Sequence, residues 1–223
     1  MRFYRGIAVP GDKADDVIKD ILDNGITTHK GRWLTDHYKP DPKLIQKPDL
    51  KLEDTRPNGT GVPAVCACGT IEGAAYYAWV HNKTKDNNIP IIIEFEHGSD
   101  NIAVDGKDFL YTVLQFGDPN RAANIVRAVF GETGLGYAQK AWANPETGAK
   151  IAIGDLMIHD PEVVSAHYAN TLTIGGRYNT RFRNAFTIGL PISAFQIVDV
   201  QSPSAPISVP QPDVDLASLL RSR

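Results

Sequence analysis

The sequence predicts an α+β fold in which two antiparallel or mixed sheets pack together, with helices at the periphery. Short apolar runs that suit strands recur along the chain, over residues 2–9, 63–68, 89–95, 180–188 and 196–200. These runs do not alternate regularly with helical segments, which argues against a parallel doubly wound sheet. Residues 1–201 are expected to form one domain, and residues 202–223 a Pro/Ser-rich linker with a short C-terminal helix.

The composition is that of a soluble globular protein with a hydrophobic core. Of the 223 residues, 42% are hydrophobic and 22% are charged. The net charge of −3 gives no general attraction to nucleic acid or to an acidic membrane. No run of about 18 apolar residues is present, so no membrane span is predicted. The N-terminus lacks the pattern of a signal peptide.

Cys66 and Cys68 are the only cysteines. They form no CxxC motif and have no pair of histidines nearby, so the sequence predicts no metal site. Two free thiols suit a reducing compartment, and we therefore expect a cytoplasmic protein.

The stretch from residue 63 to residue 96 is predicted to organise the fold. A short apolar strand over 63–68 leads to Thr70, whose hydroxyl suits the N-cap of a helix. Small apolar residues over 74–78 give that helix a closely packing face. A polar turn follows, and then a buried strand over 89–95. The glycines at the corner beside Thr70 would let a ligand approach the backbone.

The remaining helices are predicted where capping residues precede apolar stripes. They span residues 12–24, 118–130 and 160–168, with a further short helix within 131–154. Two more strands are expected over 101–104 and 109–116, around a turn at residues 105–106.

Residues 27–61 form a polar, proline-rich segment without hydrophobic periodicity. A loop of this length is uncommon inside a compact domain, and it is often a lid or a binding loop. A variable surface insertion is the alternative. Its groups able to contact a ligand are His29, Trp33, His37 and Tyr38.

Several short motifs follow one another in a distinctive order. FYRG lies on the first strand, CGT leads into AAYYA, the strand IIIEFE follows, and a late strand ends at a Leu-Pro-Ile turn. This order resembles the ADP-ribosyltransferase superfamily, the NAD-using toxins and their relatives. The resemblance implies a cleft between two sheets that binds NAD as co-substrate. It also implies transfer of ADP-ribose to a macromolecule, either a protein or a nucleic acid.

The resemblance assigns the first strand to NAD binding. Tyr4, Arg5 and Gly6 match the Tyr-Arg-Gly motif, and a guanidinium suits a pyrophosphate because it donates two parallel hydrogen bonds. The alternatives are a surface ion pair for Arg5 and a local kink of the strand at Gly6. Thr70 would contact the nicotinamide ribose or would only cap its helix.

Tyr76 and Tyr77 are neighbours on the predicted helix, so they point about 100° apart. One of them would pack in the core while the other stacks on nicotinamide. A second group, with Arg177, Arg181 and Arg183 beside Tyr178 and Phe182, would suit a nucleic-acid acceptor. The alternative for this group is an arginine-rich solvent face.

The late strand departs from the family pattern at its catalytic position. The family has a Glu there, which stabilises an oxocarbenium-like transition state, whereas the nearest polar residue here is Asn184. Either another acid enters the site (Glu94, Glu96 or Glu132), or the mechanism is unusual, or the domain binds NAD or a nucleotide without turnover. Transfer of an RNA 2′-phosphate to NAD ranks last, because it needs several site arginines and a His.

Overall fold

The computed structural model describes residues 1–27, 64–81, 87–106, 108–176, 181–204, 208 and 211–222. The chain divides into two compact units. The first comprises Met1–Ile102 and Thr187–Val209, and the second comprises Ala103–Phe186 and Pro210–Arg223. The long loop predicted over 27–61 lies outside the described residues from residue 28 onward, together with its four ligand-capable side chains. Arg177 and Tyr178 also lie outside them.

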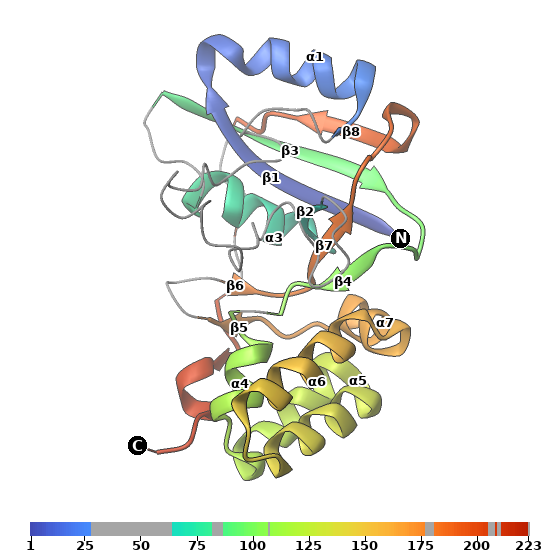
Figure 1. Cartoon of the computed structure of the whole chain (residues 1–223). Helices are drawn as coiled ribbons and strands as arrows, with labels where there is room; N and C mark the ends of the chain where they lie inside the picture. Colours follow the sequence, from blue (N-terminus) through green and yellow to red (C-terminus); the bar gives the residue numbers. More distant parts are fainter. Residues whose placement is uncertain are drawn as a thin grey trace, which may run out of the picture. The chain divides into compact units, whose positions relative to one another are not determined.

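The strands of the first unit belong to a six-stranded sheet (Figure 1). The sheet contains β1 (Arg2–Pro10), β2 (Ala64–Cys68), β3 (Asn88–Glu96), β4 (Ile102–Val104), β7 (Ala185–Gly189) and β8 (Ile197–Gln201). Their order is β4-β7-β2-β1-β3-β8. β1 pairs antiparallel with β2 and β3, and β3 pairs antiparallel with β8. Strands and helices together confirm the predicted α+β class. The strands that were expected to form two packed sheets lie mainly in this single sheet.

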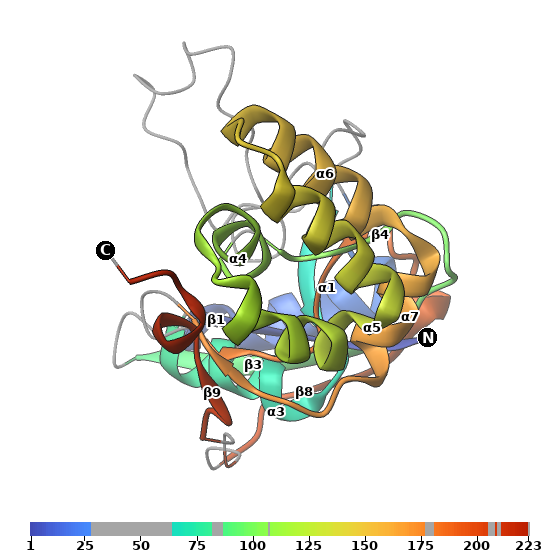
Figure 2. The same ribbon diagram turned by 90° about the horizontal axis from the view of Figure 1, so that it is seen from below.

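Two helical segments accompany the sheet in the first unit. After the 3-10 turn η1 (Gly11–Lys13), helix α1 (Ala14–Asn24) runs along β8, on the face opposite α3 (Ile71–Tyr76) (Figure 2). Gly25 ends α1 with φ 70°, as the sequence predicts. Helix α3 continues without a break into one π-helical turn, η2 (Tyr77–His81).

Helix α3 lies very close to β1 at Gly6. A Cβ atom placed on Gly6 would lie 1.9 Å from the carbonyl oxygen of Ala74 and 2.9 Å from the nitrogen of Ala78. The space that the sequence assigns to a ligand beside Gly6 is thus taken by the helix backbone. The small core that results is fully buried, and it consists of Ala74, Ala75, Ala78 and Ile92.

The second unit is mainly helical. It contains α4 (Leu110–Phe116), α5 (Pro119–Ala143), α6 (Thr147–His159) and α7 (Pro161–Ala169), with α5 and α6 side by side (Figure 2). A small sheet in the order β6-β5-β9 joins them, from β5 (Ile174–Gly175), β6 (Arg181–Phe182) and β9 (Val214–Asp215). Asp118 and Asp160 cap α5 and α7 ahead of a proline, as predicted. Gly131, with φ 75°, interrupts α5 where the helix predicted over 118–130 ends.

The strand predicted over 109–116 is wrong, because this segment forms α4. Its aromatic and β-branched residues favour a strand by propensity. However, Leu110, Val113 and Leu114 are spaced as on one helix face, and all three are buried. Burial of that face therefore outweighs the strand propensity of the individual residues, and the segment forms a helix.

The C-terminal segment also differs from the prediction. A short C-terminal helix was expected, but the chain forms β9 and a 3-10 turn, η5 (Leu216–Leu219), capped by Asp215. The Asp213 carboxylate accepts a hydrogen bond from the backbone N–H of Thr173, at 2.8 Å. Leu216 and Leu219 are buried in the protein. Among the described residues, no helix has the length and apolar character needed to cross a membrane.

Replacing Gly6 by Ala should destabilise the protein strongly. The new methyl group would overlap backbone atoms of α3, which cannot move aside as a flexible side chain would. We expect a loss of about 3 kcal/mol in the free energy of unfolding, measured by urea denaturation. Gly98→Ala is the matched control, because a Cβ atom there meets nothing within 4 Å. Equal stability of the two variants would contradict the close contact between β1 and α3.

Candidate functional site

The strand register brings the predicted motifs together on one face of the sheet. Neighbouring side chains of β1 alternate between its two faces. Tyr4 packs on the alanine core of α3, and Gly6 contacts the same helix, so both face α3. Tyr4 lies opposite Cys68 of β2 and Glu94 of β3. Arg5 points to the other face.

Arg5 is a buried arginine that links two strands. Only 2% of its surface is exposed, and its Nη1 donates a hydrogen bond of 2.6 Å to the carbonyl oxygen of Cys66. A guanidinium is costly to bury unless it is hydrogen-bonded, so this contact fixes β2 against β1 just before the corner into α3. The predicted contact of Arg5 with the NAD phosphates stays a prediction.

The corner between β2 and α3 contains the helix N-cap that the sequence predicts. Thr70 is the N-cap of α3, and its Oγ1 accepts a hydrogen bond of 3.3 Å from the Gly73 nitrogen. Cys66 and Cys68, on the strand before it, are not joined in a disulfide. The cap is confirmed, whereas contact between Thr70 and a ribose stays a prediction.

Aromatic side chains border the alanine core of α3. Tyr76 is buried and Tyr77 is half-buried, and their rings meet edge to face with centroids 5.7 Å apart. Trp79, on the π-helical turn, is also half-buried and packs on the same core as Tyr4. Sequence reasoning assigned Trp79 no role in the site. Its place on a π-helical turn, a feature frequent at functional sites, is the signal that singles it out.

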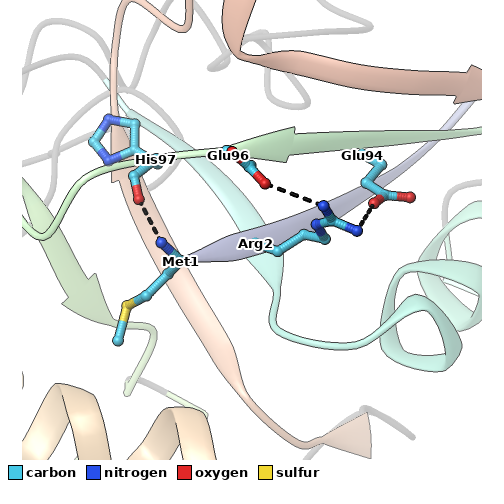
Figure 3. A network of polar contacts seen from close by, with 5 residues as sticks. All are labelled: Met1, Arg2, Glu94, Glu96 and His97. Atoms are coloured by element: carbon cyan, nitrogen blue, oxygen red, sulfur yellow. Dashed lines mark hydrogen bonds and ion pairs between the residues drawn. The ribbon is translucent and has the colours of Figure 1, made fainter.

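A carboxylate is held at the edge of this face by Arg2 (Figure 3). Nη1 of Arg2 lies 3.0 Å from Oε1 of Glu94, and Nη2 lies 3.1 Å from Oε1 of Glu96. The hydrogen bond that Arg2 donates to Glu96 and the charge of Glu94 raise the pKa of Arg2. The Glu94 side chain is 14% exposed and thus mostly enclosed, whereas Glu96 is open to solvent. Sequence reasoning missed Arg2, although its spacing of two from Tyr4 places both on one face.

Asn184 belongs to the second unit and caps helix α7. Its Nδ2 donates to the carbonyl oxygens of His167, Tyr168 and Asn170, at 2.8, 2.8 and 2.9 Å. Only 1% of its surface is exposed, and φ is 49°. The amide N–H groups therefore donate to carbonyl oxygens at the end of α7 and not to a ribose hydroxyl. We assign Asn184 a structural role.

His167 supports the same junction in the second unit. Its ring is fully buried, and its Nε2 accepts a hydrogen bond of 3.0 Å from the backbone N–H of Ala185. Burial lowers the pKa of His167 to about 3. The imidazole is therefore neutral at physiological pH, as the hydrogen bond to Nε2 requires.

Of the three carboxylates considered for catalysis, two lie in the first unit. Glu94 and Glu96 share one face of β3, as the sequence predicts. Glu132 belongs to α5 of the second unit, is exposed, and lies 2.6 Å from Nε of Arg127. Glu94 is the only one of the three that is both mostly enclosed and opposite Tyr4.

No group of three or more His, Cys, Asp or Glu side chains that could hold a metal ion occurs in the part of the chain that the structure describes. No protein-family model matches the chain, and no curated protein or solved structure matches it. The chemistry that the α3 face offers is aromatic stacking beside a carboxylate oriented by a guanidinium.

Replacing Asn184 by Ala should destabilise the fold without affecting a ligand on the α3 face. Three carbonyl oxygens at the end of α7 lose their donor, which costs about 2–4 kcal/mol in the free energy of unfolding. Urea denaturation measures this loss, with Asn120→Ala, an exposed asparagine of α5, as the control. A variant as stable as the wild type would contradict the capping role.

Proposed function

We propose that this protein transfers ADP-ribose from NAD to a macromolecular acceptor, a protein or a nucleic acid, with NAD bound on the α3 face of the first unit. The observation that carries the proposal is the register that sets Tyr4 between Cys68 and Glu94. Through this register, the first-strand motif, the strand-to-helix corner and a carboxylate become neighbours. On this proposal, the α+β architecture is that of an ADP-ribosyltransferase, whose cleft receives NAD.

The half-buried aromatic residues are suited to bind the flat rings of NAD. Tyr4, Tyr77 and Trp79 are each only partly buried, and an aromatic face stacks on nicotinamide or adenine. Thr70, at the corner before α3, is proposed to contact the nicotinamide ribose. Arg5 points to the other face of the sheet and supports this corner from behind, through its hydrogen bond to the Cys66 carbonyl oxygen.

Glu94 is the carboxylate proposed to stabilise the transition state. The bond between the ribose C1 and the nicotinamide nitrogen breaks, and its electron pair leaves with nicotinamide. Positive charge then develops on the ribose, where a preorganised carboxylate lowers its energy, as in glycoside hydrolysis. The acceptor nucleophile bonds to C1 and releases its proton. Arg2 holds one oxygen of Glu94 in place for this step.

A specific observation favours an alternative, in which the domain binds NAD or another nucleotide without turnover. The late strand offers Asn184 in place of a Glu, and this amide caps α7. Glu94 already interacts with Arg2, which offsets part of its negative charge. Release of nicotinamide distinguishes the two functions, because only the transferase breaks the glycosidic bond.

Replacing Glu94 by Gln should slow nicotinamide release from NAD roughly 100-fold, because the amide supplies no negative charge in the transition state. NAD affinity, measured by calorimetry, should change little. Nicotinamide is quantified by chromatography after incubation with NAD and with cell protein or RNA as acceptors. Glu132→Gln is the matched control, since it removes an exposed carboxylate of the second unit.

The outcomes separate the two functions. Saturable NAD binding by the wild type without nicotinamide release would favour the binding module. Release that survives in Glu94→Gln would remove Glu94 from the mechanism. If the wild type does not bind NAD at all, the transferase is wrong, and so is a binding module for NAD.

A further inference from the structure

Phe195 is the most exposed large hydrophobic residue among those that the structure describes. It lies on the 3-10 turn η4 (Ala194–Gln196) before β8, with 91% of its surface exposed. Val198 and Leu22, 47% and 49% exposed, lie on β8 and in the last turn of α1. Phenylalanine is ordinarily among the most buried residue types. A phenylalanine held almost fully in solvent is therefore a candidate contact residue.

The turn that carries Phe195 is rigidly built. Ser193 and Gln196 form a capping box, in which Oε1 of Gln196 accepts from the Ser193 nitrogen at 3.0 Å. Nε2 of Gln196 also donates to the carbonyl oxygen of Glu96, at 3.1 Å. Ile26 and Ile192 exchange two backbone hydrogen bonds, of 2.7 and 2.9 Å, just before the turn. An aromatic side chain on such a fixed backbone loses little conformational entropy when it binds.

The end of α1 lies directly against this turn. A Cβ atom placed on Gly25 would lie 2.1 Å from the carbonyl oxygen of Ile192 and 2.7 Å from the nitrogen of Ala194. Leu22 and Asp23, in the last turn of α1, are both exposed. The last turn of α1 therefore lies near the turn η4, and we call Leu22, Asp23, Phe195 and Val198 the Phe195 surface.

The helix α1, which ends beside the turn that carries Phe195, is acidic. The segment of η1 and α1 contains two lysines but five aspartates: Asp12, Asp15, Asp16, Asp20 and Asp23. The last turn of α1 contains no basic residue, although cations are favoured at the negative end of a helix dipole. Negative charge at the end of α1 thus works against helix stability.

We infer that the Phe195 surface docks a lysine- or arginine-rich segment of another protein, with Phe195 as the apolar anchor. Charge complementarity selects this partner, because the acidic groups attract a basic segment and steer its approach. The same charges repel the phosphates of a nucleic acid. They also disfavour a second copy of this chain, since Asp23 would face acidic groups of the same surface. The inference does not depend on the proposed NAD activity.

The test uses a phage library of random 12-residue peptides, selected against the full-length protein at low salt. We expect the enriched peptides to be rich in Lys and Arg and to contain an apolar residue. Synthetic copies should bind Phe195→Ser at least about tenfold more weakly than the wild type, as expected for an anchor. Asp23→Asn should weaken binding about threefold, and added salt should weaken it further.

Phe116→Ser is the matched control, because Phe116 is an exposed phenylalanine of the second unit. It should bind the peptides as the wild type does, and thermal melts should show that both serine variants remain folded. The inference is wrong if no peptide is enriched, if the enriched peptides are neutral or acidic, or if they bind Phe195→Ser equally well. A wild-type dimer that dissociates in Phe195→Ser, seen by sedimentation, would replace the partner protein with a second copy.

Discussion

The contact between Gly6 and the backbone of α3 is the constraint on which the arrangement of the first unit depends. Because β1 has no side chain at this position, the backbone of the helix packs directly against the strand at Ala74 and Ala78. The small buried core leaves the large side chains of this face, Tyr4 and Trp79, at its border, where they remain half-exposed. The partly exposed aromatic border of this face is therefore a consequence of how tightly its centre is packed.

The two arginines of β1 show how strand geometry separates residues that are close in sequence. Arg2 and Arg5 are three positions apart, so they lie on opposite faces of the sheet. Arg5 is enclosed and holds β2 through the carbonyl oxygen of Cys66. Arg2 is half-exposed and orients Glu94. One guanidinium thus supports the corner before α3, while the other holds the carboxylate that the proposed reaction uses.

Local features were predictable from sequence because their chemistry is contained in a few neighbouring residues. Thr70, Asp118 and Asp160 cap their helices as expected, and Gly25 and Gly131 end helical segments with positive φ. Most of the strands were also predicted, since their apolar runs are short and distinct.

Features that depend on distant parts of the chain were not predictable. Helix α4 was predicted as a strand because the core that buries Leu110 and Val113 is formed by residues far along the chain. The ion pair of Arg2 with Glu94 requires the register of β1 against β3. Asn184 was read as a stand-in for a catalytic acid, since nothing local reveals that its amide reaches the end of α7.

Hydrogen exchange in the presence of saturating NAD tests most directly whether the α3 face of the first unit is the NAD site. The account predicts slower exchange in residues 71–81, which form α3 and η2, and in β1. Exchange in α5 to α7 of the second unit should remain unchanged. Protection confined to the second unit, or no protection in α3 when calorimetry shows that NAD binds, would contradict the account.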